Sequence, residues 1–138
     1  MTARFHKTFI AAPEHIDVMG HVNNAVWVQW IQDMATAHWD AVARAEDQAR
    51  FVWLVVRHEI DYRGNISEGE AAAGETVIKD GPRGPRFDRH FSFADDSGKE
   101  LVRAKTTFAM IDRASRRLTR VPAEVAAPFA PTGGWSAD

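Results

Sequence analysis

Residues 23–47 read NNAVWVQWIQDMATAHWDAVARAED and contain no glycine or proline, which predicts one long helix. The polar residues of this segment fall at helical spacing in one narrow stripe, and most other positions are apolar or aromatic. The stripe is formed by Gln29, Gln32, Asp33, Thr36 and Asp40. A helix on the surface of a small domain has the opposite proportions. We therefore expect the rest of the chain to wrap this helix on several sides, as a curved sheet does.

The segments on either side of this helix have the composition of β-strands. One precedes it and four follow, at residues 4–12, 51–63, 70–79, 86–94 and 100–111. Segment 86–94 alternates with period two, which places Phe87, Arg89, Phe91 and Phe93 on one face and Arg86, Asp88, His90 and Ser92 on the other. Strands that follow one another, instead of alternating with helices, predict an α+β fold with a five-stranded antiparallel sheet.

The length of 138 residues suits one domain, and the sequence contains no repeat or linker. We predict a single domain over residues 1–128 and a loosely ordered C-terminal tail over residues 129–138. The net charge of −2 disfavours nucleic acid and anionic membranes as partners. Cysteine is absent, which excludes disulfide scaffolds and cysteine nucleophiles, and no apolar run approaches the roughly 20 residues of a membrane span. These features predict a soluble, cytoplasmic protein.

The segment before the helix, DVMGHVNNA at residues 17–25, combines a carboxylate, a glycine and two asparagines suited to capping a helix. Amides in the first turn of a helix are unpaired and carry partial positive charge, so they bind oxyanions. A carboxylate beside such donors is sufficient for acyl transfer from an activated ester. The alternative interpretation is structural: Asp17, Asn23 and Asn24 only cap turns, and His21 packs against the sheet.

Other catalytic motifs are missing from the sequence, including the G-x-S-x-G elbow, the P-loop, the dinucleotide-binding glycine motif and H-E-x-x-H. The histidines lack the spacing of metal ligands, apart from a loose group formed by His15, Asp17 and His21. We therefore expect neither a metal site nor a cofactor.

The string D-x-x-G-H-V-N-N-A-x-W at Asp17–Trp27 resembles the signature of hotdog-fold acyl-CoA thioesterases of the 4-hydroxybenzoyl-CoA thioesterase type, in which the last position is usually Tyr. The preceding PEHID at residues 13–17 is similar to the P-E-W-I-D opening of one branch, which includes thioesterases linked to carnitine and betaine metabolism. RHEIDY at residues 57–62 is also similar to a strand of this family, and the likeness spans about residues 5–125. Ala35 departs from the pattern, because an Arg is common there.

This resemblance implies a hotdog fold, in which a long central helix is wrapped by a five-stranded antiparallel sheet. It implies homodimers or homotetramers with active sites shared across the dimer interface, and an acyl-CoA as substrate. By position, Asp17 matches the catalytic carboxylate, and the backbone amides of Asn24 and Ala25 match the oxyanion contacts. The residues that shape the substrate-binding turn are matched by Gly20, His21 and Asn23.

A thiol leaves far more readily than an amine or an alkoxide, so thioester hydrolysis requires no strong general acid. Asp17 either attacks the carbonyl carbon or takes a proton from the attacking water, and the sequence leaves both routes open. Trp27 is a candidate for lining the acyl pocket, with core packing as the alternative. Arginine side chains suit coenzyme A phosphates, and they form two clusters: Arg83, Arg86 and Arg89 with Lys79, and Arg113, Arg116, Arg117 and Arg120.

Two other functions stay open at this point. A hotdog protein can bind acyl-CoA without turnover, and this alternative predicts saturable binding with no release of thiol. A hotdog dehydratase or hydratase would use His21 and Asp33 as acid and base, although the D-x-N-x-x-H string of the hydratases is missing.

Overall fold

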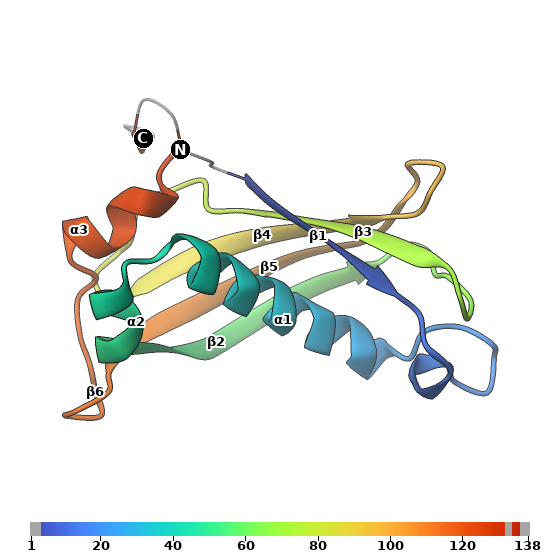
Figure 1. The fold of residues 1–138 in the computed structure, drawn as a ribbon, viewed down its shortest axis with the longest axis horizontal. Helices are drawn as coiled ribbons and strands as arrows, with labels where there is room; N and C mark the ends of the chain where they lie inside the picture. Colours follow the sequence, from blue (N-terminus) through green and yellow to red (C-terminus); the bar gives the residue numbers. More distant parts are fainter. Residues whose placement is uncertain (1–3, 132–133, 136–138) are drawn as a thin grey trace.

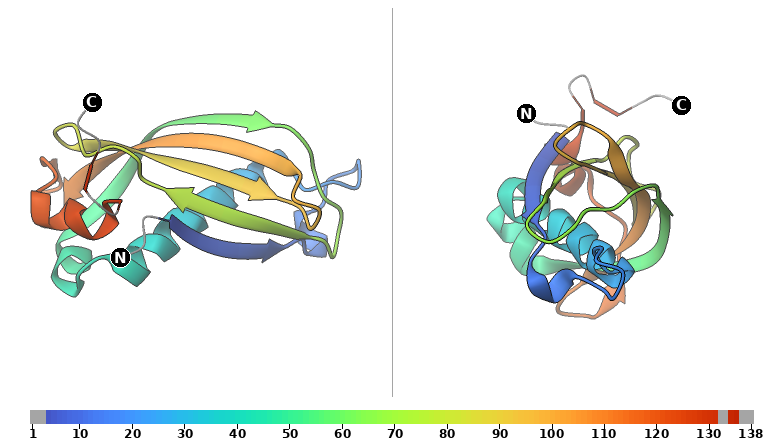
Figure 2. Two further views of the ribbon diagram at one scale, coloured as in Figure 1. Left: turned by 90° about the horizontal axis from the view of Figure 1, so that it is seen from above. Right: turned by 90° about the vertical axis from the view of Figure 1, so that its right-hand side faces the viewer.

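The computed structural model describes residues 4–131 and 134–135. Its elements in chain order are β1 (Arg4–Ile10), η1 (Pro13–His15), α1 (Asn24–Val42), α2 (Ala45–Arg50), β2 (Phe51–Tyr62), β3 (Ala71–Val77), β4 (Arg86–Ala94), β5 (Glu100–Asp112), β6 (Arg117–Leu118), α3 (Ala123–Ala126) and η2 (Ala127–Phe129). The strands pair in the antiparallel order β1-β3-β4-β5-β2, and the short β6 adds to β5. The sheet curves around α1 (Figures 1 and 2). The predicted α+β hotdog architecture is therefore confirmed, whereas β6, α3 and η2 were not predicted.

The central helix α1 presents its apolar arc to the sheet and its polar stripe to the surface. The buried positions are Trp27, Trp30, Ile31, Met34, Ala35 and His38. All five residues of the predicted polar stripe are exposed, as the periodicity indicates. The sheet approaches the helix so closely that a Cβ on Gly74 of β3 would lie 2.5 Å from Cε of Met34. The same Cβ would lie 2.9 Å from the backbone carbonyl of Lys7 in β1, which cannot move aside as a methionine side chain can, so glycine is favoured at this position.

The end of α1 differs from the prediction, because the helix stops at Val42 and does not continue to Asp47. Ala43 and Arg44 are extended, with ψ of 147° and 148°, and the short α2 begins after them. Side chains compensate the break: Gln48 Nε2 donates to the carbonyl of Ala43 at 2.9 Å, and Arg44 donates two hydrogen bonds to Asp47. The helix thus ends without glycine or proline.

The C-terminal segment contributes to the core. Phe129 is only 4% exposed, stacks on Trp39 with ring centroids 5.7 Å apart, and meets the His38 ring edge-on at 5.0 Å. The expectation of a loosely ordered tail from residue 129 is therefore wrong for Phe129, while the parts of that tail at 132–133 and 136–138 lie outside the described residues. α3 and η2 cover the end of the molecule where α1 finishes (Figure 1).

Within the described ranges, none of the helices has the length and apolarity needed to cross a membrane.

Candidate functional site

The loop between η1 and α1 folds back on itself and forms a small hairpin, residues 16–22, which we call the Asp17 turn. Ile16 and Val22 form an antiparallel bridge. The Asp17 amide donates to the carbonyl of His21 at 2.8 Å, and the Gly20 amide donates to the carbonyl of Asp17 at 3.0 Å. Gly20 has a φ of +79°, a left-handed conformation that favours glycine. These backbone hydrogen bonds therefore fix the position of Asp17 in the turn.

The side chain of Asp17 is held by its own turn. Oδ1 accepts hydrogen bonds from the amides of Met19, at 2.9 Å, and His21, at 3.2 Å. Asp17 is half-buried, and in the part of the chain that the structure describes it takes part in no ion pair. The carboxylate is therefore oriented by backbone amides while its charge is not matched by a cation, which suits a reacting group.

The start of α1 is joined directly to this turn. The Asn23 amide donates to the carbonyl of His15 at 2.9 Å, and the Asn23 side chain caps the helix by accepting from the Ala25 amide at 2.9 Å. One of the two amides expected to bind an oxyanion is therefore engaged by the cap. For the Asn24 amide, the described residues provide no hydrogen-bond acceptor. This amide is the donor at the start of α1 that stays available for a ligand.

Two residues at and after the end of β2 hold this region together: Tyr62, which ends the RHEIDY string, and Asn65, which the sequence analysis did not single out. Asn65, after β2, accepts from the Val22 amide and donates to the Val22 carbonyl, each at 3.1 Å. Tyr62, near the end of β2, donates from its hydroxyl to the carbonyl of Asn24 at 3.3 Å. Burial raises the pKa of the Tyr62 phenol, so this donor keeps its proton at neutral pH. Asn65 and Tyr62 lie about 40 residues from their partners, so their contacts with the start of α1 could not be predicted from local patterns.

The structure separates several of the predicted substrate-binding residues from this site. Trp27 is fully buried between the rings of Trp30 and Phe93, so it belongs to the core. Arg86 is exposed on β4, whereas Arg89 is only 3% exposed and points to the inner face of the sheet. Arg89 therefore does not join Arg86 in a surface cluster for phosphates, because the two side chains leave β4 on opposite faces.

His21 and Asp33 are not brought together either. His21 is exposed on the Asp17 turn, and Asp33 lies on the exposed stripe of α1, where it accepts a hydrogen bond from Gln29 at 2.9 Å. Asp33 is nine residues into the helix, a rise of about 13 Å at 1.5 Å per residue. Within the described ranges, no group of three or more potential ligand side chains is placed to hold a metal ion.

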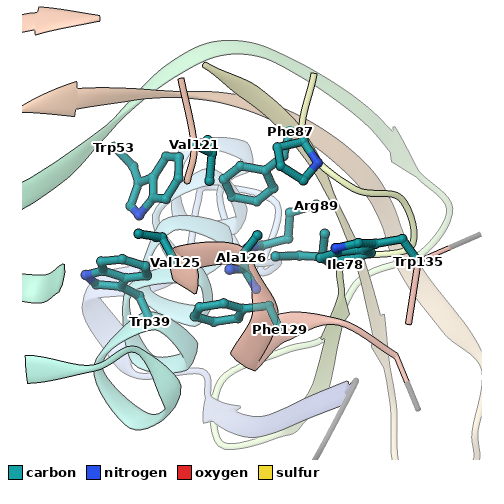
Figure 3. Close-up of a pocket in the computed structure, with 11 residues that line it drawn as sticks. Trp39, Trp53, Ile78, Phe87, Arg89, Val121, Val125, Ala126, Phe129 and Trp135 are labelled. Atoms are coloured by element: carbon teal, nitrogen blue, oxygen red, sulfur yellow. The ribbon is translucent and has the colours of Figure 1, made fainter. Parts of the chain in front are cut away.

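Two hollows lie at the other end of α1. A groove of about 390 Å³ runs between α1 and β2, and its walls include Gln32, Thr36, Asp40, Val52, Val55 and Phe108. A smaller aromatic cavity of about 20 Å³ lies under α3 and η2 (Figure 3). The two hollows share Trp39, Trp53, Phe87 and Arg89 as lining residues. Neither hollow is lined by Asp17, so in the described part of the chain the Asp17 turn and these two hollows are apart.

The chain matches the family model described as the Thioesterase-like superfamily over residues 11–129. The chain belongs to this superfamily. A search of curated proteins found no match.

Solved structures share the hotdog thioesterase fold at low sequence identity. A 1,4-dihydroxy-2-naphthoyl-CoA thioesterase from Synechocystis superposes with a TM-score of 0.77 at 16% identity, covering 91% of this chain and 95% of its own. A hypothetical protein from Staphylococcus aureus in complex with CoA gives 0.81 at 15% identity, covering 98% and 87%. A probable thioesterase from Escherichia coli gives 0.75 at 19% identity, covering 90% and 95%. At these identities the likeness concerns the fold.

Proposed function

We propose that this member of the superfamily hydrolyses acyl-CoA thioesters, as a protein of the 4-hydroxybenzoyl-CoA thioesterase type, with Asp17 as the reacting carboxylate. The observation that carries the proposal is the position of Asp17: its carboxylate is oriented by the amides of its own turn, and that turn runs directly into the start of α1. The thioesterase and CoA-complex neighbours are consistent with a CoA thioester as substrate.

In this proposal the carbonyl oxygen of the thioester accepts a hydrogen bond from the Asn24 amide. The Ala25 amide joins it when the Asn23 side chain releases it. Each donor aimed at the developing oxyanion contributes on the order of 3 kcal/mol to the transition state. Asp17 either takes a proton from water as the water oxygen attacks the carbonyl carbon, or attacks that carbon itself to give an anhydride that water then cleaves. In both routes the C–S bond breaks, the thiolate is protonated, and a carboxylic acid is released.

We also propose that the active form is a homodimer or a homotetramer in which neighbouring copies complete the site. β2 is an edge of the sheet, and its apolar residues Leu54 and Val56 are exposed. Two copies that pair antiparallel along β2 are related by a two-fold axis, which also sets their α1 helices antiparallel. The start of one α1 then lies beside the groove at the end of the other. This arrangement places the Asp17 turn of one copy next to the groove of the other, which Asp17 of the same chain does not line.

The exposed Arg86 remains a candidate for binding coenzyme A phosphates, and a cytoplasmic location remains a prediction.

The second candidate function is acyl-CoA binding without turnover. One observation favours it. The Asn23 side chain accepts the hydrogen bond of the Ala25 amide, so only one of the two expected oxyanion donors is free to bind a ligand.

The test is release of free thiol from acetyl-, hexanoyl-, palmitoyl-, benzoyl- and 4-hydroxybenzoyl-CoA. We expect the wild type to hydrolyse at least one of these, and Asp17→Asn to lower kcat by about 100-fold or more. Asp96→Asn, at an exposed position in the turn between β4 and β5, is the matched control and should retain the wild-type rate. An Asp17→Asn protein with an unchanged rate contradicts the role of Asp17, and saturable binding without thiol release supports the second candidate.

A further inference from the structure

A buried arginine without a carboxylate partner lies beside the groove. Arg89 forms no ion pair with any of the described residues. Its Nη1 lies 2.6 Å from Nδ1 of His38 and donates to Oγ1 of Thr76 at 3.5 Å. Its Nε is buried and has no hydrogen-bond partner in the described part of the chain. Buried arginines are ordinarily paired with an anion, so the absence of one here calls for an explanation.

The neighbouring histidine does not supply the missing negative charge. Burial, assisted by the charge of Arg89, lowers the pKa of His38 to about 3, so the imidazole is neutral at neutral pH. Because Nδ1 accepts from Arg89, the proton of the neutral ring is on Nε2, and this atom is buried without a partner as well. Burial lowers the pKa of Arg89 to about 9, so the guanidinium is still charged at neutral pH. The pair therefore carries one uncompensated positive charge and two fully buried donor atoms without a partner.

Aromatic faces compensate this charge only in part. The guanidinium carbon of Arg89 lies 5.8 Å from the ring centroid of Phe87 and 6.0 Å from that of Phe129. Contacts at these distances are at the outer limit of a cation–π interaction. The remaining walls are apolar, and Figure 3 shows Arg89 among them at the centre of the cavity. Among the described residues, Arg89 is the only charged side chain that lines this cavity, so a carboxylate at its border would pair with the guanidinium.

The shape of the two hollows limits what such an anion can be. The cavity, at about 20 Å³, has room for a group of about the size of one water molecule. The adjoining groove, at about 390 Å³, accommodates a small organic chain. Since Arg89 lines both, a chain that lies in the groove can place its far end against the guanidinium. The groove and the charge of Arg89 together fit a chain with a terminal anionic group that stays in the groove, because the cavity is too small to take up a carboxylate.

We propose that the groove binds the acyl portion of the substrate and that Arg89 binds a carboxylate at its far end, so that the preferred substrates are ω-carboxyacyl thioesters. This inference rests on the proposed thioesterase function and names its substrate class. The two oxygens of the carboxylate accept from the Arg89 guanidinium. An acyl group with a quaternary ammonium, such as a betainyl group, is repelled by the same charge.

The test compares two thioesters of equal chain length, adipoyl-CoA with a terminal carboxylate and hexanoyl-CoA with a terminal methyl group, in chloride-free buffer at pH 7.5. We expect kcat/KM of the wild type to be at least about 10-fold higher for adipoyl-CoA, the effect of one charge-assisted hydrogen bond. Arg89→Gln should reduce this ratio to about one or below. Arg103→Gln, an exposed arginine on β5, is the matched control and should keep the wild-type ratio.

Binding measurements separate this inference from the proposed hydrolysis. S-(5-carboxypentyl)-CoA and S-hexyl-CoA are thioethers that cannot be hydrolysed, and calorimetric titration of the wild type gives their Kd values. Tighter binding of the carboxylate thioether without thiol release from any thioester refutes the hydrolysis and supports the role of Arg89. Thiol release with equal kcat/KM for both thioesters, or equal Kd for both thioethers, overturns the role of Arg89 and leaves the hydrolysis intact. If Arg89→Gln does not fold, Arg89→Lys replaces it and should lower the ratio. A ratio that is lost instead in Arg113→Gln, the other arginine that lines the groove, overturns the role of Arg89.

Discussion

The two ends of α1 satisfy their polar groups in different ways. At the start of the helix, backbone amides of the Asp17 turn hold the carboxylate, and the tip of that turn is open, with the Val18 side chain fully exposed. At the end of the helix, His38 and Arg89 are buried among aromatic rings and satisfy each other only in part. One end therefore holds a charge at the surface. At the other end the charge of Arg89 is buried inside the fold, where its electrostatic interactions are strongest.

The largest difference that we expect between the two ends is in stability. Phe129→Ala removes a buried ring from the contacts with Trp39 and His38, and should lower the free energy of unfolding by about 4 kcal/mol. Met19→Ala, at the exposed tip of the Asp17 turn, should change it by less than about 0.5 kcal/mol. Urea denaturation measures both values. Equal losses would mean that the C-terminal segment adds nothing to the core.

The second expected difference depends on pH. The pKa of His38 is about 3 in the folded protein and about 6.5 in the unfolded chain, so between these values the unfolded chain binds more protons. Stability therefore falls as the pH falls through this window. The loss attributable to His38 between pH 6.5 and pH 4 is about 3 kcal/mol, at roughly 1.4 kcal/mol for each pH unit.

His38→Gln tests this linkage, because glutamine keeps an acceptor for Arg89 but does not titrate. Urea denaturation at pH 7, 6, 5 and 4 should show a steeper loss of stability for the wild type than for His38→Gln. Parallel curves for the two proteins would show that the imidazole does not remain neutral within the fold, and the charge assigned to the His38–Arg89 pair would be wrong.

The same two ends show which features of the structure can be predicted from the sequence. The narrow polar stripe of α1 predicted a wrapped helix, and the period-two pattern of residues 86–94 predicted the faces of β4 correctly. That alternation already placed Arg89 with Phe87, Phe91 and Phe93, all of which are buried. The grouping of Arg89 with Arg83 and Arg86 as a phosphate-binding cluster, which follows from the fit of arginine to phosphate, is wrong for Arg89. The period was the better guide, since strand geometry fixes the direction of a side chain whatever its charge.

Other features could not be predicted because distant segments create them. The link from Asn65 to Val22 depends on the sheet closing around the helix, and so does the pairing of His38 on α1 with Arg89 on β4. The end of α1 at Val42 has no glycine or proline to mark it, and depends on the side chain of Gln48. The role of Asp17 in catalysis is still a prediction, although its position ahead of α1 follows from the sequence.

The smallest expected effect separates backbone strain from chemistry. Gly20 and Gly98 both have a positive φ, of +79° and +88°, and a Cβ on either would meet no atom within 4 Å. Gly20→Ala and Gly98→Ala should therefore each lower the free energy of unfolding by about 1 kcal/mol, the cost of a left-handed alanine. Only Gly20→Ala should also slow thiol release, by about 3- to 10-fold, because the Gly20 amide donates to the carbonyl of Asp17 and a shifted turn misplaces the carboxylate. Equal rates in the two variants, at equal losses of stability, would show that the geometry of the Asp17 turn does not matter to the reaction.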